Sequence, residues 1–178
     1  MKSKIILSCL LAFHLNSNAE LAKLTLPNNG FFIANIPCQT QVVKMNSTAG
    51  VTNALQCRVD DGQSVCIFSI NEQPLDIQSF NKWGFKFIEE VHKQFASQMD
   101  RNYRTISQKT IQFGGLGEVL TYELLRQQDG MTINSKGTWL VANDRMLRGA
   151  INCAPHSTSF MKSERELFFQ SLSVMNKR

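Results

Sequence analysis

Four of the five cysteines lie after residue 19, spread along most of the chain, and they constrain its fold more than any other feature of the sequence. They are Cys38, Cys57, Cys66 and Cys153. An even number of cysteines in an exported protein favours disulfide bonds, and four cysteines allow three different pairings. The fold therefore depends on whether the chain leaves the cytoplasm and on which strands bring two cysteines together.

The first nineteen residues have the three zones of a secretory signal peptide. Two lysines precede an apolar run over residues 5–15, and small residues at Ser17 and Ala19 predict cleavage before Glu20. A membrane anchor would need about 20 apolar residues in a helix, and His14 interrupts this run. We therefore predict an exported protein, located in a periplasm or secreted.

Removal of residues 1–19 would leave one domain at residues 20–178, which is long enough to bury a sizeable apolar core. The removed segment contains lysines and no acidic residue, so the whole-chain net charge of +5 overstates the basic character of the domain. Basic residues are scattered from Lys23 to Arg178 without a run, whereas nucleic-acid-binding proteins cluster them on one face or arm. We expect no nucleic-acid partner.

A hairpin turn at Asp61-Gly62 would bring two of the cysteines together, because Asp-Gly is the strongest short hairpin signal. If these two residues form the turn, Cys57 lies directly opposite Cys66. Counting from the turn makes this a non-hydrogen-bonded pair, in which side chains approach most closely. The geometry therefore predicts a disulfide between them. A turn displaced by one residue would remove the basis for this pairing.

The other two cysteines, Cys38 and Cys153, would then form the second disulfide. Such a bond closes a long loop, and the chain-entropy model gives a contribution of about 4 to 5 kcal/mol to stability. We expect both bonds to be structural.

Most of the chain reads as strands separated by short turns, and two segments read as helices. The predicted strands cover residues 31–36, 53–59, 64–70, 105–113, 118–126, 132–142 and 145–152. The predicted helices cover residues 77–100 and 160–175. We therefore expect an α+β fold, in which an antiparallel β-sheet is covered by a long central helix and a C-terminal helix.

The helix predicted at residues 77–100 has a broad apolar stripe opposite a charged face. The stripe contains Phe80, Trp83, Phe87, Ile88, Val91, Phe95 and Met99. Such a helix covers a sheet in its own domain or lies on a membrane surface or a partner. The acidic Glu89 and Glu90 among the lysines favour the first interpretation. Gly84 interrupts the stripe and predicts close backbone packing or a break at that point.

No catalytic or metal-binding signature is present. His92 and His156 lie far apart, and neither has a histidine or cysteine at metal-ligand spacing. The glycine-rich stretch at residues 114–117 lies between strands and does not open a helix, which argues against a phosphate loop. The acidic pairs at residues 60–61 and 89–90 are neighbours in sequence and do not converge across a substrate. We predict no catalytic residue, no cofactor and no metal.

Two features suggest a surface role. A tight turn at Asn143-Asp144 would place Trp139 opposite Arg148, where the guanidinium can lie over the indole. This pair is the candidate for surface binding, and the alternative is that it stabilises the sheet. Residues 46–48 form a glycosylation sequon, which has meaning in a eukaryotic source.

The order of elements and two short motifs resemble the PsbP-like family, named for an extrinsic subunit of photosystem II. One motif is the strand 30–37, which starts Gly-Phe-Phe and ends Ile-Pro. The other is residues 168–172, Phe-Phe-Gln-Ser-Leu, in a helix that follows a late strand at 146–153. The resemblance covers residues 24–175 and implies a sandwich of a curved antiparallel sheet and helices. Members mostly lack the four cysteines, and no functional residue is carried over.

The resemblance implies a binding or assembly module, and the absence of a catalytic set agrees with a non-enzymatic role. We predict an exported binding or accessory protein with a protein partner. One alternative is a secreted hydrolase whose site forms only in the folded chain, which a cleft joining a histidine to a carboxylate and a hydroxyl would support. Another is a protein that binds a lipid or membrane surface through its aromatic-rich helix.

Overall fold

The structure is a computed structural model that describes residues 19–27, 30–47, 50–142, 144–155 and 159–176. The predicted signal peptide lies outside the described residues except for Ala19. The strands are β1 (Glu20–Thr25), β2 (Gly30–Ile36), β3 (Gln41–Ser47), β4 (Gly50–Asp60), β5 (Val65–Pro74), β6 (Arg104–Gln112), β7 (Glu118–Gln128), β8 (Met131–Ala142), β9 (Arg145–Ala154) and β10 (Ser173–Asn176). The α-helices are α1 (Ile77–Trp83), α2 (Phe85–Met99) and α3 (Lys162–Ser171).

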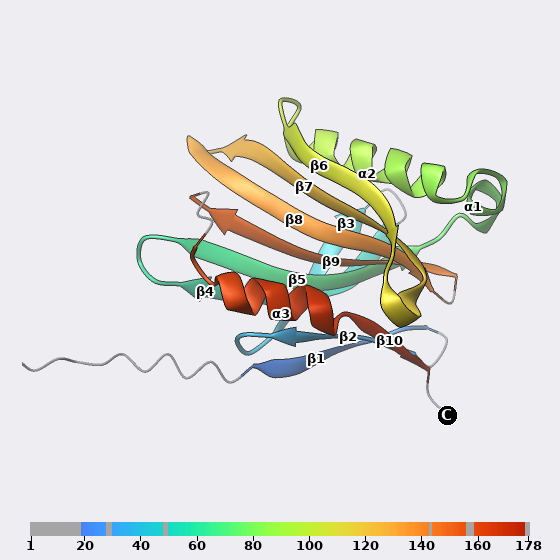
Figure 1. Cartoon of the computed structure of the whole chain (residues 1–178), viewed down its shortest axis with the longest axis horizontal. Helices are drawn as coiled ribbons and strands as arrows, with labels where there is room; N and C mark the ends of the chain where they lie inside the picture. Colours follow the sequence, from blue (N-terminus) through green and yellow to red (C-terminus); the bar gives the residue numbers. More distant parts are fainter. Residues whose placement is uncertain (1–18, 28–29, 48–49, 143, 156–158, 177–178) are drawn as a thin grey trace, which may run out of the picture.

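These strands form two antiparallel sheets. The larger sheet has the order β3-β4-β5-β9-β8-β7-β6, and the smaller has the order β1-β2-β10. In Figure 1 the smaller sheet and α3 lie on one face of the larger sheet, and α2 lies on the opposite face. The seven-stranded sheet is therefore the central layer of the molecule.

The expected α+β fold, an antiparallel sheet covered by two helices, is wrong. The protein is mostly β, and its α-helices have only 7, 15 and 10 residues. The sheet face opposite α2 is covered largely by the second sheet, whose Phe32 and Ala34 pack in one core with Phe68 and Ile151 of the larger sheet.

The second sheet was missed because its outer strands carry weak sequence signals. In β1 only Ala22 and Leu24 are buried. The four residues of β10 follow α3 after a single residue, so an apolar pattern that continues from the helix conceals the change to a strand. Pairing with β2 on both of its sides is a tertiary contact, and local periodicity does not report it.

The long helix predicted at residues 77–100 is divided at Gly84. This glycine has φ 58° and ψ −141°, a conformation that other residues rarely adopt. Its amide donates to the carbonyl of Phe80 and ends α1, and α2 begins at the next residue. At the start of α1 the Asp76 side chain accepts a hydrogen bond from the amide of Ser79. A break was one of the two outcomes predicted for this position.

Helix α2 packs on the larger sheet. It buries Ile88, His92 and Ala96, which are spaced four residues apart on one face. Ile88 and Ala96 join Leu120 and Trp139 of the sheet in a second core.

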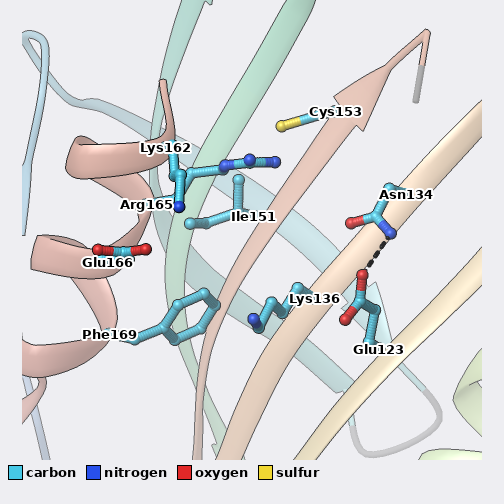
Figure 2. Close-up of a pocket in the computed structure, with 9 residues that line it drawn as sticks. All are labelled: Glu123, Asn134, Lys136, Ile151, Cys153, Lys162, Arg165, Glu166 and Phe169. Carbon is cyan, nitrogen blue, oxygen red and sulfur yellow. Dashed lines mark hydrogen bonds between the residues drawn. The ribbon is translucent and has the colours of Figure 1, made fainter. Parts of the chain in front are cut away.

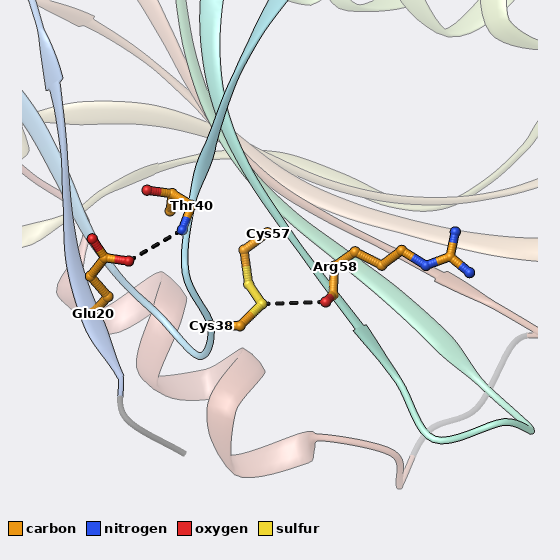
Figure 3. The surroundings of a disulfide bond; sticks show 5 residues. All are labelled: Glu20, Cys38, Thr40, Cys57 and Arg58. Atoms are coloured by element: carbon orange, nitrogen blue, oxygen red, sulfur yellow. Dashed lines mark hydrogen bonds between the residues drawn. A yellow bond between two sulfur atoms is a disulfide. The ribbon is translucent and has the colours of Figure 1, made fainter. Parts of the chain in front are cut away.

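The four cysteines of the described residues are in disulfides, as predicted, but the predicted pairing is wrong. The bonds join Cys38 to Cys57 and Cys66 to Cys153. Cys66 lies directly opposite Cys153 where β5 pairs with β9. The first bond ties the segment after β2 to β4, beside a contact in which Glu20 accepts a hydrogen bond from the Thr40 amide (Figure 3).

The pairing was wrong because the hairpin turn has four residues instead of two. Asp60 pairs with Val65, and this register places Cys57 opposite Phe68 instead of Cys66. The turn over residues 61–64 is held by Asp61, whose Oδ1 accepts hydrogen bonds from the amides of residues 63 and 64. Aspartate side chains commonly fix turns in this way, and here the bonds shift the register away from the Asp-Gly dipeptide.

Two disulfides are consistent with export, because such bonds form and persist in oxidising compartments. Within the described residues, no helix is long and apolar enough to span a membrane.

Candidate functional site

A cleft of about 240 Å³ lies between α3 and the face of the larger sheet formed by β7, β8 and β9 (Figure 2). We call it the α3 cleft. It is lined by Glu123, Asn134, Lys136, Ile151, Cys153, Lys162, Arg165, Glu166 and Phe169. One wall is thus a helix face, and the other is a sheet face.

The helix wall is built from residues three and four positions apart in α3, Lys162, Arg165, Glu166 and Phe169. This spacing places them on one side of a helix. The helix is held in place on another side by Phe168, which is fully buried in the core and packs edge-on against Phe68 of β5, with ring centroids 5.7 Å apart.

The sheet wall is built from alternate residues of neighbouring strands. Asn134 and Lys136 of β8 lie opposite Cys153 and Ile151 of β9, so all four side chains share one face. Ile151 and Cys153 are buried and form an apolar floor. Cys153 is bonded to Cys66, which covalently fixes the floor to β5.

Asn134 is a polar residue that is only 5% exposed at this wall. Its Nδ2 donates to the Glu123 Oε1 at 2.8 Å. Figure 2 shows its carbonyl oxygen on the other side of the amide, directed into the cleft. The cleft therefore offers a fixed hydrogen-bond acceptor beside its basic side chains.

Three basic side chains and two acidic ones border the α3 cleft, so it is basic on balance. Within the described residues, no ion pair joins Lys136 or Lys162 to an acidic side chain. The Lys136 Nζ lies 6.0 Å from the centroid of the Phe169 ring. An anionic group can thus meet two lysines, and an adjoining apolar group can rest on Phe169 and Ile151.

The pair suggested for surface binding lies on the opposite face of the sheet. The structure pairs Trp139 with Arg148 between β8 and β9, the register that a turn at residues 143–144 predicts. Both side chains are covered by α2 and are only 1% and 3% exposed. The pair is therefore inside the molecule, where it contributes to the packing of α2 on the sheet.

Aromatic rings surround the Arg148 guanidinium. It lies 4.4 Å from the ring centroid of Phe95 and 5.6 Å from those of Tyr122 and Trp139. Its Nε donates to the Tyr122 hydroxyl at 2.7 Å. Burial raises the pKa of the Tyr122 hydroxyl, so the phenol stays protonated and available as the acceptor.

His92 belongs to the same cluster. Its Nδ1 accepts a hydrogen bond from the Trp139 indole at 3.3 Å, and its ring centroid lies 4.1 Å from that of Tyr122. Burial, with a smaller effect of the Arg148 charge, lowers the pKa of His92 to about 4. The imidazole is therefore neutral near pH 7. His156 lies outside the described residues.

The acidic pairs and the glycine-rich stretch noted in the sequence make only local contacts. Asp60 forms an ion pair with Arg58, and Glu89 accepts a hydrogen bond from Thr110. The glycine-rich stretch includes a short 3-10 turn between β6 and β7, Gly114–Leu116. The sequon at residues 46–48 lies partly outside the described residues.

No histidine is among the described residues that line the α3 cleft. The condition that would favour a hydrolase, a histidine in a cleft with a carboxylate and a hydroxyl, is not met there. In the described part of the chain, no group of three or more histidine, cysteine or acidic residues is placed to hold a metal ion.

Sequence reasoning missed the residues of the α3 cleft. Two signals were present. One is the i, i+3, i+4, i+7 spacing of Lys162, Arg165, Glu166 and Phe169. The other is the occurrence of Asn134 and Lys136 at alternate positions of one strand, which places them on the same face of the sheet.

No protein-family model matches the chain, and no curated protein sequence matches it. Among solved structures it is similar to PA94 of Pseudomonas aeruginosa, a protein of unknown function, with a TM-score of 0.53 and 12% identity over 86% of this chain and 96% of that chain. It is also similar to LpqN of Mycobacterium tuberculosis, involved in cell envelope biogenesis, with a TM-score of 0.45 and 10% identity over 89% and 92% of the two chains.

These likenesses concern the fold alone. The identity to PA94 is too low to transfer a role, and the TM-score to LpqN is too low to support an argument. The resemblance to the PsbP-like family stays a prediction.

Proposed function

We propose that this chain is an exported, non-enzymatic binding protein that holds a small anionic ligand in the α3 cleft. The observation that supports the proposal is the convergence of Lys136 and Lys162, from a strand and a helix, on a cavity of about 240 Å³ with an apolar floor. The two disulfides support export.

The composition of the cleft is that of a ligand site. Such sites combine an apolar surface with a few polar groups that point to one place. Ile151 and Phe169 supply the apolar surface, and Asn134 supplies a buried polar group whose carbonyl faces the cavity. Lys136 and Lys162 are exposed, and both border the same cleft.

The charge of the cleft favours a carboxylate or phosphate group, because lysine and arginine form their strongest hydrogen bonds with such anions. The volume is below the usual range for drug-sized ligands, roughly 300 to 1,000 Å³. We therefore infer a compact ligand with one anionic group and one apolar group. The terminal residue of a peptide has both, which would also accommodate the protein partner expected from the sequence.

The test uses protein recovered from the exported fraction of expressing cells, titrated with N-acetylphenylalanine and followed by amide NMR. We expect signal changes in α3 and in β8 around Lys136. The uncharged analogue N-acetylphenylalanine amide should bind at least about tenfold more weakly, because it lacks the charge-assisted hydrogen bonds.

Charge-reversal variants locate the site. Lys136→Glu and Lys162→Glu should each weaken binding of the carboxylate. Lys109→Glu, an equal change of charge at an exposed position of β6, should leave binding unchanged. Signal changes away from α3 and β8, or equal effects of all three variants, would contradict the proposal.

A further inference from the structure

Helix α1 is the least buried helix of the protein. None of its residues is buried, and Trp83 and Ile77 are 56% and 42% exposed. In Figure 1 this helix lies at one end of the molecule, beyond the end of α2. A tryptophan with more than half of its surface in contact with water is unusual, because its large ring gains much from burial.

The backbone at Gly84 accounts for this exposure. In an unbroken helix, Trp83 would follow the apolar stripe that α2 packs on the sheet. The turn at Gly84 ends α1 instead, and Phe80 anchors it by an edge-on contact with Phe85 at 5.8 Å. Ile77 and Trp83 find no such contact that would bury them and stay exposed.

From α1 to the first turn of α2, the charged side chains are all basic. From Ile77 to Ile88 the sequence contains two lysines and no acidic residue. Lys82 and Lys86 are both exposed, and the Lys82 Nζ lies 4.8 Å from the Trp83 ring centroid. Asp76, at the far end of α1, is engaged by Ser79 as the helix cap.

We propose that α1 docks the protein on a lipid bilayer surface that carries anionic headgroups. Tryptophan is enriched at the boundary between headgroups and acyl chains, where its ring is apolar and its N–H is hydrated. Trp83 and Ile77 enter this boundary, and Lys82 and Lys86 meet the lipid phosphates. The charge of this segment selects an anionic surface, and its position at one end of the molecule lets it reach a flat one.

This inference is independent of the proposed function. The residues of α1 do not line the α3 cleft, and that cleft lies on the face of the sheet opposite α2. Loss of vesicle binding and loss of ligand binding are therefore separate results.

The two tryptophans make a direct test possible, because Trp83 is exposed and Trp139 is only 1% exposed. Exported protein is mixed with phosphatidylcholine vesicles that contain or lack phosphatidylglycerol. With the anionic vesicles we expect Trp83 emission to shift to shorter wavelength and its quenching by acrylamide to fall. The Trp83→Phe variant should show neither change, because Trp139 is already shielded.

Vesicle flotation measures the contribution of each group. The double variant Lys82→Glu with Lys86→Glu should weaken binding by roughly thirtyfold or more, from about 1 kcal/mol per lysine near an anionic surface. Trp83→Ala should weaken it roughly tenfold or more. As a matched control, Lys23→Glu with Lys109→Glu changes the net charge equally at exposed positions of β1 and β6.

The proposal is overturned if the protein does not float with anionic vesicles. It is also overturned if the control pair weakens binding as much as the α1 pair, because binding would then follow net charge and not this helix. Unchanged Trp83 emission on vesicles to which the protein is bound would likewise exclude α1 as the docking element.

Discussion

Charged and polar side chains lie at both faces of the seven-stranded sheet, but their surroundings differ. On the α2 face, Arg148 and His92 are buried and bonded to Tyr122 and Trp139. On the α3 face, Lys136 and Lys162 border a cavity and have no ion pair within the described residues.

This difference separates structural polar groups from those available to a ligand. A buried polar cluster whose members bond to one another rigidifies a core. Polar groups that converge on a cavity instead leave hydrogen bonds for another molecule. We therefore assign the α2 face to stability and the α3 face to binding, and mutation can test the assignment.

The largest expected effect is the loss of the Cys66–Cys153 disulfide at the floor of the α3 face. It joins residues 87 positions apart, and the Cys38–Cys57 bond joins residues 19 apart. The chain-entropy model predicts a loss of about 4 to 5 kcal/mol for the first pair and about 3 kcal/mol for the second when both cysteines become alanine. Urea unfolding of the two double variants measures this, and a greater loss for the shorter loop would contradict it.

The next effect concerns the centre of the α2 face. Arg148→Ala should lower the free energy of unfolding by about 3 to 4 kcal/mol, because it leaves a cavity and removes the partner of the Tyr122 hydroxyl. Arg148→Met preserves most of the volume and should cost less. If Arg148→Ala left stability unchanged but abolished binding of N-acetylphenylalanine, the division between the two faces would fail.

Titration of His92, on the α2 face, should make the free energy of unfolding depend on pH. Its pKa is lowered from 6.5 to about 4 in the folded protein. Stability is therefore full above pH 6.5 and declines as the pH falls from 6.5 towards 4, since the unfolded chain binds the proton first. The total loss is about 3 kcal/mol.

Urea unfolding at pH 7 and pH 5 compares the wild type with His92→Gln. The carboxylates are the same in both proteins, so the difference between them isolates the histidine. Equal declines in the two proteins would show that His92 does not titrate in this range.

The smallest expected change in stability concerns the α3 face. Lys136→Glu and Lys162→Glu should each change the free energy of unfolding by less than about 0.5 kcal/mol, as exposed substitutions usually do. The same variants should weaken ligand binding. A large loss of stability would make these lysines structural and would remove the contrast between the faces.

Much of the larger sheet was predictable from sequence. Strands β6 to β9 are separated by turns rich in Gly, Asn and Asp, so their existence and the opposition of Trp139 to Arg148 follow from local pattern. The disulfide pairing was not predictable, because two hydrogen bonds that the Asp61 side chain accepts from backbone amides set the turn length.

The α3 cleft was harder to foresee than any strand. Lys136 and Phe169 are ordinary residues of a strand and a helix when each is read alone. They meet because Phe168 fixes α3 over the sheet, and that contact joins segments far apart in sequence. The exposure of Trp83 was not foreseen for the opposite reason: local periodicity assigned Trp83 to an apolar stripe, which Gly84 interrupts.

The position of β2 has a consequence for export. This strand lies between the first strand of the described chain and the last, so the smaller sheet needs residues from both ends. A chain that crosses a membrane with its N-terminus first cannot complete this sheet until residues 173–176 have followed. A chain exported in this way would complete its fold in the destination compartment, and a chain halted partway would present β2 with one edge open to other strands.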